Sequence, residues 1–288
     1  MTWRLPLPSG RVLELDRRPK VMGVLNVTPD SFSDGGLRLD PERAVEHGVR
    51  MAEQGADLLD LGAESTRPGG GVYGVGAREV AADEELDRLL PVLEALRRAV
   101  DLPLSVDTRK GAVARRALLA GADLINDVGG LADPELVAVV AQSGCPVVVM
   151  HSRGELASMQ RGIRFDDVTR EVARELAAAG ERASAGGVDR EQLIFDPGIG
   201  FGKTGGQNLR LLRQLDRLFG LGRPILLGAS RKSFIAEVDP APPSERLGGS
   251  LAALGWAARL GASIVRVHDV AESVQFLRLW NAIDSAGR

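Results

Sequence analysis

Short apolar runs that end in polar or charged residues recur eight times along the chain, and a segment with helix-like spacing follows each one. The runs are Val21–Leu25, Leu58–Leu61, Pro103–Val106, Asp123–Ile125, Pro146–Met150, Gln192–Phe195, Pro224–Leu227 and Ser263–Val267. They are rich in Val, Ile and Leu and do not alternate strictly, which is typical of parallel strands buried on both faces. Eight strand–helix repeats predict an α/β fold, a single (β/α)8 barrel that occupies residues 1–288.

The segment before the first run predicts a β-hairpin over residues 3–15, which turns at Pro8-Ser9-Gly10. We expect this hairpin, within residues 1–18, to cap the end of the barrel where the strands begin. The sequence therefore predicts a closed floor beneath the barrel, opposite the ends of the strands.

Helix boundaries are marked by local signals. Asp40-Pro41-Glu42 and Asp133-Pro134-Glu135 each combine an N-cap residue with proline at the first helical position. Pro91 lies inside the helix-like stretch Ala77–Val100, so we expect that helix to kink or to begin anew there. Glycine stands between a helix and the next strand at Gly55, Gly121, Gly144, Gly222 and Gly261, where a left-handed cap favours it.

Three strand-to-helix loops are longer than the others, at residues 27–39, 63–76 and 197–206. All three follow strands, so we expect them on one face of the barrel as mobile covers over a site. The third loop resembles a nucleotide-binding P-loop, but Pro197 stands where that motif has its first glycine. We expect its glycines to let the loop lie close to a ligand.

Acidic and amide side chains end three of the predicted strands, at Asp107, Asn126 and Asp196. Carboxylates match adjacent N–H groups of a cyclic, guanidine-like edge, and an amide both donates and accepts. The set predicts a pocket for a flat polar ring such as a pterin or a purine. Salt bridges between these carboxylates and buried arginines in the barrel layers would give the same pattern, so that alternative stays open.

Cationic groups gather at other strand ends, at Arg67, Arg266 and His268. In a closed barrel the last strand adjoins the first, which ends at Asn26, and Asp34 lies on the loop that follows. Arginine matches phosphate oxygens, and a neutral oxygen suits Mg²⁺ held mainly by substrate phosphates and water. These residues predict a diphosphate site, whereas His151, at the end of the fifth strand, has no predicted role.

Composition narrows the function classes. The net charge of −3 among 288 residues gives no electrostatic case for nucleic acid or an anionic membrane, and no apolar run approaches a membrane span. Cys145 is the only cysteine, and no segment resembles a signal peptide, so we expect a cytoplasmic protein. Positive charge comes mostly from arginine, which makes the lysine at position 232 conspicuous.

At these residues the sequence resembles the dihydropteroate synthases, pterin-binding enzymes with a TIM-barrel fold, over residues 20–268. The matching segments are Met22–Gly36, Gly62–Gly69, Ser105–Thr108, Ile125–Asp127, Asp196–Lys203, Gly228–Ser233 and Arg266–Asp269. That family joins (7,8-dihydropterin-6-yl)methyl diphosphate to 4-aminobenzoate with release of diphosphate. The resemblance therefore implies a transferase of folate biosynthesis.

The resemblance also implies residue roles. Asp107, Asn126, Asp196 and Lys232 should hold the pterin, while Arg67, Arg266 and His268 should bind diphosphate. Asn26 and Asp34 should ligate Mg²⁺, and we expect Lys232, Arg67 and Asp107 to act in catalysis. The aminobenzoate pocket should be formed by Phe32, Thr66, Pro68, Phe201, Ser230 and Lys232.

Other consequences of the resemblance concern order of reaction and assembly. Diphosphate is expected to depart first, with Mg²⁺ neutralising it, before the arylamine attacks. The family also implies a homodimer. Two alternatives remain open: a pterin-binding domain that presents methyl-tetrahydrofolate for methyl transfer, and a catalytically silent paralogue.

Overall fold

Eight parallel strands form the centre of the molecule, as the apolar runs predict. The computed structural model describes residues 2–16, 18–27, 40–63, 80–154 and 162–286. The strands are β3 (Lys20–Asn26), β4 (Leu58–Gly62), β5 (Leu104–Asp107), β6 (Leu124–Asp127), β7 (Val147–Met150), β8 (Leu193–Asp196), β9 (Leu226–Leu227) and β10 (Ile264–Val267). Each of them falls on a predicted run, with ends that differ by one or two residues.

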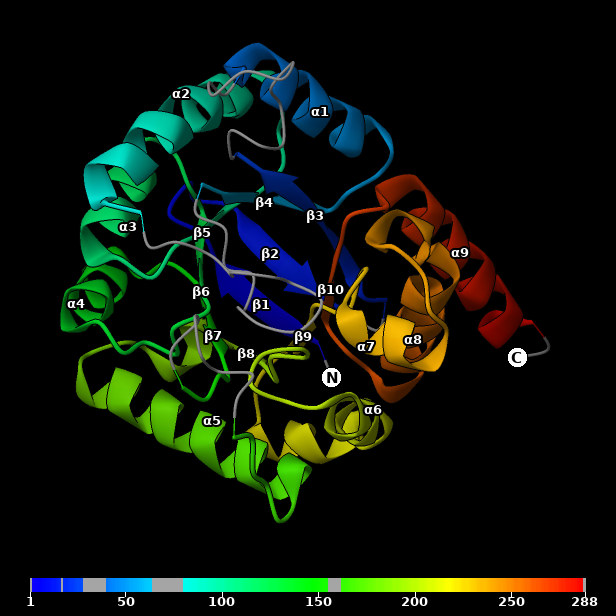
Figure 1. Cartoon of the computed structure of the whole chain (residues 1–288). Coiled ribbons are helices and arrows are strands. Elements are labelled where there is room, and N and C mark those ends of the chain that lie inside the picture. The colour runs from blue at the N-terminus through cyan, green and yellow to red at the C-terminus, as the bar shows by residue number, and fades with distance from the viewer. Residues whose placement is uncertain (1, 17, 28–39, 64–79, 155–161, 287–288) are drawn as a thin grey trace.

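The strands close into a barrel. Their order around the sheet is β8-β7-β6-β5-β4-β3-β10-β9, and a parallel bridge between Phe195 and Ile225 joins β8 to the start of β9. Figure 1 is a view along the axis of the barrel and shows the helices arranged outside the ring of strands. The predicted (β/α)8 barrel is confirmed, and the carboxyl ends of all eight strands meet at one mouth.

Helices surround the barrel and bury their apolar faces against it. They are α1 (Pro41–Glu53), α2 (Ala82–Ala99), α3 (Gly111–Leu119), α4 (Pro134–Ser143), α5 (Val168–Ala185), α6 (Gly205–Arg213), α7 (Ser233–Val238), α8 (Leu247–Leu260) and α9 (Val270–Ser285). Three short 3-10 helices lie at Arg190–Gln192, Leu215–Leu221 and Pro243–Glu245. None of the described helices is both long and apolar enough to cross a membrane.

The local helix signals are largely confirmed. The Asp40 carboxylate accepts hydrogen bonds from the backbone N–H groups of Glu42 and Arg43, and Asp133 caps α4 in the same way. Of the two outcomes expected at Pro91, a kink or a new helix start, the new start is wrong, because α2 runs through that residue as one helix. Pro91 and Asp87, whose carbonyl lacks the usual N–H partner, both lie on the solvent side, where water can replace the missing bond.

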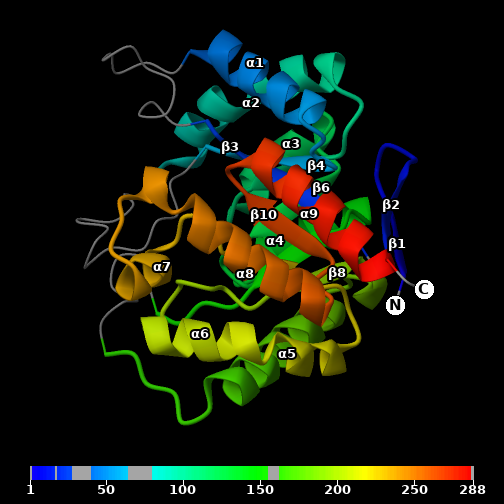
Figure 2. The same cartoon turned by 90° about the vertical axis from the view of Figure 1, so that its right-hand side faces the viewer.

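The hairpin closes the floor of the barrel, as predicted. β1 (Trp3–Pro6) pairs with β2 (Val12–Leu15) in an antiparallel arrangement. Their inward side chains, Leu5, Leu13 and Leu15, pack with barrel residues that include Met22 and Leu58 in one buried cluster. Figure 2 shows the hairpin at one end of the barrel, with α7 toward the opposite end. Any site inside the barrel therefore opens at the mouth where the strands end.

Candidate active site

Three of the predicted site residues form a buried polar set at the mouth. Asp107 ends β5, Asn126 lies beside it on β6 in the same register row, and Asp196 ends β8. Their exposed fractions are only 4%, 3% and 5%. Parallel strands place these ends side by side, so residues 89 positions apart in the sequence face one space.

Burial changes the acidity of both carboxyl groups. It raises the pKa of Asp107 to about 8; the charge of Arg266 lowers this pKa, while the negative charges of Asp60, Glu85 and Asp127 raise it further. Burial also raises the pKa of Asp196, against the attraction of Lys232. The Oδ1 atom of Asp107 is buried and has no hydrogen-bond partner among the described residues. A buried acceptor in that state is suited to a ligand that donates an N–H group.

Asp60 is a buried residue that the sequence analysis missed. It lies deeper in the barrel than this set and binds side chains that belong to it or adjoin it. Its carboxylate is fully buried and accepts hydrogen bonds from Ser105 Oγ at 2.6 Å and Asn126 Nδ2 at 2.9 Å. Because Asn126 turns its NH₂ group toward Asp60, its amide oxygen remains for other partners. A charged residue within the apolar run Leu58–Leu61 was the signal that could have revealed it.

Arg266 contacts two carboxylates. Its Nε donates to Asp60 Oδ2 at 2.6 Å, and its Nη2 donates to Asp107 Oδ2 at 3.1 Å. The buried salt bridges that stayed open as an alternative are therefore present, and they involve a residue that was predicted to bind diphosphate.

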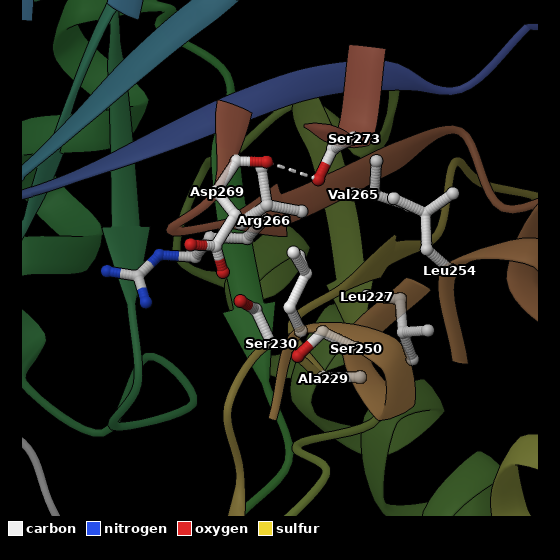
Figure 3. Close-up of a pocket in the computed structure, with 11 residues that line it drawn as sticks. Leu227, Ala229, Ser230, Ser250, Leu254, Val265, Arg266, Asp269 and Ser273 are labelled. Atoms are coloured by element: carbon white, nitrogen blue, oxygen red, sulfur yellow. Dashed lines mark hydrogen bonds between the residues drawn. The ribbon is translucent and has the colours of Figure 1, made fainter. Parts of the chain in front are cut away.

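Figure 3 shows the Arg266 guanidinium pointing away from a small cavity beneath β10 that Ser230, Ser250 and Asp269 help to line. That cavity, of about 10 Å³, has room for roughly one water molecule.

Lys232 lies at the N-cap of α7 and reaches across the mouth. Its Nζ donates to the backbone carbonyl of Ile199 and lies 4.6 Å from the centre of the Phe201 ring. Asp196 and Asp107 both attract its charge, although burial lowers the pKa of Lys232 to about 8. The structure therefore places Lys232 next to the Phe201 ring and within electrostatic reach of Asp196.

The segment that carries Ser230 and Lys232 is held from two helices. Arg231 has φ +58° and forms a bidentate ion pair with Asp269, which precedes α9, while its backbone N–H donates to Ser250 Oγ of α8 at 2.9 Å. Ser230 Oγ lies 3.1 Å from His268 Nδ1. A positive φ at a residue other than glycine is strained and persists where surrounding contacts fix it, so this turn is a pre-formed part of the site.

The remaining predicted residues are only partly described. Asn26 ends β3 beside Gly62, which in turn lies beside Asp107, so it stands two strands away from the carboxylate set. Phe32, Asp34, Thr66, Arg67 and Pro68 lie outside the described residues. The loops at 27–39 and 63–76 fall almost entirely outside them too, whereas residues 197–206 are described in full.

Lys203, which the sequence analysis also missed, is a buried residue of this third loop. Its Nζ lies 2.9 Å from His151 Nδ1 and donates to the carbonyls of Gly198 and Phe201. Burial among neutral acceptors lowers the pKa of Lys203 to about 7. The scarcity of lysine that drew attention to Lys232 applies equally to Lys203, and His151 gains a partner that its sequence position did not reveal.

Comparison with known proteins agrees with this geometry. The family described as "Pterin binding enzyme" matches residues 22–268. Dihydropteroate synthase of Synechocystis sp. is 44% identical over 281 residues, which cover 96% of this chain and 95% of that protein.

Solved structures show the same similarity. The structure of Xanthomonas albilineans dihydropteroate synthase with 4-aminobenzoic acid is 47% identical, with a TM-score of 0.90, and the match covers 99% of this chain and 100% of that one. The same enzyme in complex with 7,8-dihydropteroate matches with a TM-score of 0.86 and 45% identity, over 98% and 99% of the two chains. The chain therefore belongs to the pterin binding enzyme family and, within it, to the dihydropteroate synthases.

Proposed function

We propose that this protein condenses (7,8-dihydropterin-6-yl)methyl diphosphate with 4-aminobenzoate to give 7,8-dihydropteroate and diphosphate in folate biosynthesis. The observation that carries the proposal is the buried set of Asp107, Asn126 and Asp196 with Lys232 at the mouth of the barrel. The related enzyme from Xanthomonas albilineans, solved with 4-aminobenzoic acid and with 7,8-dihydropteroate, supports this choice of substrates.

The pterin is assigned to the carboxylate set. Asp196 and the unpartnered Oδ1 of Asp107 accept from N–H groups of the ring, and Asn126 offers the amide oxygen that Asp60 leaves free. Lys232, whose charge Asp196 attracts, supplies a donor to the polar edge of the ring. The carboxylates are costly to bury without such a partner, so the pocket favours a ligand rich in N–H donors.

The diphosphate is assigned to Arg266 and His268 together with Arg67. The Arg266 guanidinium already pairs with Asp60 and Asp107, so we infer that diphosphate competes with Asp107 for its Nη2 donor. This exchange would free Asp107 for the pterin. Arginine presents several donors in a fixed plane, which allows one guanidinium to keep Asp60 while it binds a phosphate oxygen.

A magnesium ion is assigned to Asn26 and Asp34. Among the described residues there is no cluster of three or more His, Cys, Asp or Glu side chains that could hold a metal. A lone amide oxygen at the end of β3 fits a magnesium ion that takes most of its ligands from phosphates and water. When bound, Mg²⁺ would supply positive charge to the departing diphosphate.

The arylamine is assigned to the outer part of the mouth, among Phe201, Ser230 and Lys232, with Phe32, Thr66 and Pro68 completing the pocket. An arylamine is unprotonated at neutral pH and attacks without a general base. The described residues therefore need to orient it rather than activate it. The electron-rich dihydropterin stabilises positive charge on its methylene carbon, which favours departure of diphosphate before attack.

The direct test supplies purified protein with the pterin diphosphate, 4-aminobenzoate and Mg²⁺, and measures 7,8-dihydropteroate and diphosphate. Formation of both products is expected, and absence of both contradicts the proposal. Methyl transfer from methyl-tetrahydrofolate would support the alternative domain, and pterin binding without either reaction would identify a silent paralogue. Release of diphosphate without 4-aminobenzoate supports early departure, whereas strict dependence on the arylamine contradicts it.

We further infer a homodimer through the outer face of α6, α7 and α8. A groove of about 480 Å³ lies among these helices, and its apolar lining includes Leu209, Val238 and Trp256, which are 44%, 67% and 40% exposed. The three helices lie side by side in Figure 2. Exposed apolar surface of this kind marks an interaction site, and a second copy can bury the same patch on both subunits.

Light scattering tests the dimer. The native protein should have twice the mass of the 30.6 kDa chain, and Trp256→Glu should shift the mass toward one chain. Leu119→Glu is the control and should leave the mass unchanged, since Leu119 is 80% exposed on α3, away from the groove. A native monomer, or a Trp256→Glu protein with unchanged mass at all concentrations, would remove this interface.

We also infer a cytoplasmic location. Cys145 is the single cysteine of the chain, and it is buried and unpaired. Free buried thiols are common in reducing compartments, where disulfides are rare. Fractionation of cells that produce the protein would test this location.

A further inference from the structure

A cluster of four titratable side chains, two of them buried and two partly buried, lies beside the carboxylate set, and the predicted roles do not use it. It consists of His151 after β7, Lys203 after β8, Glu175 on α5, and Arg153, which joins Glu175 from the β7 side. Lys203 and His151 are only 3% and 4% exposed. We call these four residues the Lys203 cluster.

The Lys203 ammonium has four acceptors within hydrogen-bond distance of its three protons. Its Nζ donates to the carbonyls of Gly198 and Phe201, both at 2.9 Å, and lies 2.9 Å from His151 Nδ1. The backbone carbonyl of His151 is a more distant acceptor, at 3.4 Å. An ammonium has three donors and no acceptor, so in its contact with His151 Nδ1 Lys203 is the donor. Lys203 therefore fixes two carbonyls of one turn against the end of the neighbouring strand.

The protonation state of His151 follows from its second nitrogen. The Glu175 carboxylate only accepts, so the neutral ring carries its proton on Nε2 and donates it to Glu175 Oε2 at 3.0 Å, which leaves Nδ1 as the acceptor for Lys203. Burial and the Lys203 charge lower the pKa of His151 to about 4, which keeps the ring neutral. Arg153 holds Glu175 by two donors, and the contacts with His151 and Arg153 hold the pKa of Glu175 well below its usual range.

The turn that Lys203 holds carries contacts to the pterin site. The backbone N–H of Gly198 donates to Asp196 Oδ1 at 2.7 Å, and the carbonyl of Ile199 accepts from Lys232 Nζ. Phe201, whose carbonyl binds Lys203, places its ring 4.6 Å from Lys232 Nζ. Asp196 and Lys232, both assigned to the pterin, therefore take their positions partly from this turn.

The turn also lies directly on the backbone of His151, the residue that follows β7. Gly198 has φ +66°, and a Cβ atom there would lie 1.9 Å from the carbonyl oxygen of His151. From the other side, Asn208 of α6 accepts from the backbone N–H of Gly200 at 2.8 Å. The Lys203 cluster is thus the polar contact between this turn and the strand beneath it.

We propose that Lys203 and His151 are positioning residues of the pterin subsite: they fix the Gly198–Phe201 turn so that Asp196 and Lys232 face the ring. This inference rests on the proposed function and adds residues to its binding machinery. Lys203 acts on the turn, His151 sets the direction of the Lys203 ammonium, and Glu175 sets the tautomer of His151. Both residues act through the turn, and the proposal gives neither of them a contact with the substrate.

The first test replaces Lys203 with methionine, which keeps the length of the side chain and removes its three donors. The dissociation constant of 6-hydroxymethylpterin, measured by calorimetry without Mg²⁺ or arylamine, should rise by about tenfold, the effect expected when a buried hydrogen bond is lost. Lys20→Met is the matched control, because Lys20 is a partly buried lysine that pairs with Asp57 at the floor of the barrel. It should leave the dissociation constant unchanged.

A second pair of variants separates positioning from general stability. In His151→Asn the amide oxygen occupies the place of Nδ1 and still accepts from Lys203, whereas in His151→Gln the amide lies near Nε2 and keeps only the Glu175 contact. His151→Asn should bind 6-hydroxymethylpterin within about threefold of the native protein, and His151→Gln should approach the affinity of Lys203→Met. Thermal unfolding, followed by circular dichroism, sets a temperature at which all variants are folded.

The outcomes separate a failure of the proposed function from a failure of the positioning role. If the native protein does not bind 6-hydroxymethylpterin, the proposed function fails and this inference fails with it. If the native protein binds it and folded Lys203→Met binds equally well, the positioning role alone is overturned. Equal affinities for His151→Asn and His151→Gln would also overturn the assigned tautomer and, with it, the role of His151.

Discussion

At the scale of single residues, Asp60 shows how one buried carboxylate sets the orientation of several partners. It accepts from Ser105, Asn126 and Arg266, so its negative charge lies at the centre of the polar layer below the mouth. Replacing only one member of a buried pair is destabilising, because the other charge stays buried without its full complement. Asp60 therefore matters for stability and for the direction in which Asn126 presents its amide.

We predict that Asp60→Asn lowers the free energy of unfolding by about 3 kcal/mol and weakens pterin binding. Urea denaturation measures the first effect, and calorimetry measures the second. Asp101→Asn is the control, since the Asp101 side chain is fully exposed in its ion pair with Arg11 and such pairs contribute little. An Asp60→Asn protein as stable as Asp101→Asn would contradict the central role of Asp60.

Asp107 gives a prediction about pH. Its pKa in the folded protein, about 8, lies above its usual value of 3.8, so between these values the folded state binds more protons than the unfolded state. The Asp107 contribution therefore makes the protein less stable as the pH rises from about 4 to about 8. Asp107→Asn removes this contribution, and its stability relative to the native protein should improve across that window by more than about 1 kcal/mol.

Chemical denaturation at pH 5 and at pH 8 measures this difference. The same substitution should weaken pterin binding, because the amide replaces one acceptor oxygen with a donor. A constant difference in stability between the native protein and Asp107→Asn at the two pH values would show that Asp107 titrates normally.

At the scale of elements, the Gly198–Phe201 turn connects strand geometry to the site. Gly198 has a positive φ, and the carbonyl oxygen of His151 lies 1.9 Å from the point that a Cβ atom would occupy, so two independent constraints require glycine there. Gly206, eight residues later in the first turn of α6, has no atom within 4 Å of a Cβ position. The two glycines therefore form a matched pair for substitution.

Gly198→Ala should destabilise the protein by about 2 kcal/mol and weaken pterin binding, because the turn must move away from β7. Gly206→Ala should be neutral or stabilise the protein by up to about 1 kcal/mol, since alanine favours the helix. Thermal unfolding and calorimetric titration of both variants test this contrast. Equal behaviour of the two variants would show that the turn is free to shift.

The elements also show what sequence could and could not predict. Helix starts at Asp40 and Asp133 were predictable, because a cap acts on backbone N–H groups two or three residues away. The uninterrupted course of α2 through Pro91 was not, since it depends on which side of the helix faces solvent. Strand ends shifted by a residue or two because hydrogen bonding between neighbours decides them.

In the site, too, residues marked by local sequence signals were predictable, and residues that depend on distant contacts were not. Asp107, Asn126 and Asp196 were found because each stands at the end of an apolar run, a position visible in the sequence. The contact between Lys203 and His151 spans 52 residues, and that between Asp60 and Arg266 spans 206. Such pairs depend on the registers of strands around the closed barrel, and one sequence does not specify them.

At the scale of the whole molecule, the hairpin and the site occupy opposite ends of the barrel. Leu5 and Leu15 are fully buried against the floor, while the carboxylate set lies at the ends of the strands. In a barrel of this kind, one end serves stability and the other serves binding. The two properties should therefore respond to different substitutions.

Leu5→Ala should lower the free energy of unfolding by about 2 to 5 kcal/mol, because it leaves a cavity in the floor cluster. The Michaelis constants for both substrates should stay within error of the native values at a temperature where the variant is folded. Val12→Ala is the control on the same hairpin, since Val12 is 41% exposed and should affect neither property. A changed Michaelis constant in Leu5→Ala would reveal coupling between floor and mouth.

The closed floor of the barrel also affects the order in which ligands bind and dissociate. Leucine side chains from the hairpin plug the lower end, so a small molecule reaches the interior only through the mouth. Ligands then enter and leave through the same opening, so the ligand that binds deeper in the barrel must bind first and dissociate last. Asp60 and Asn126 lie within the barrel, whereas Ser230 lies on the segment after β9. A ring bound at Asn126 would therefore be trapped for as long as a second molecule occupies the space beside Ser230.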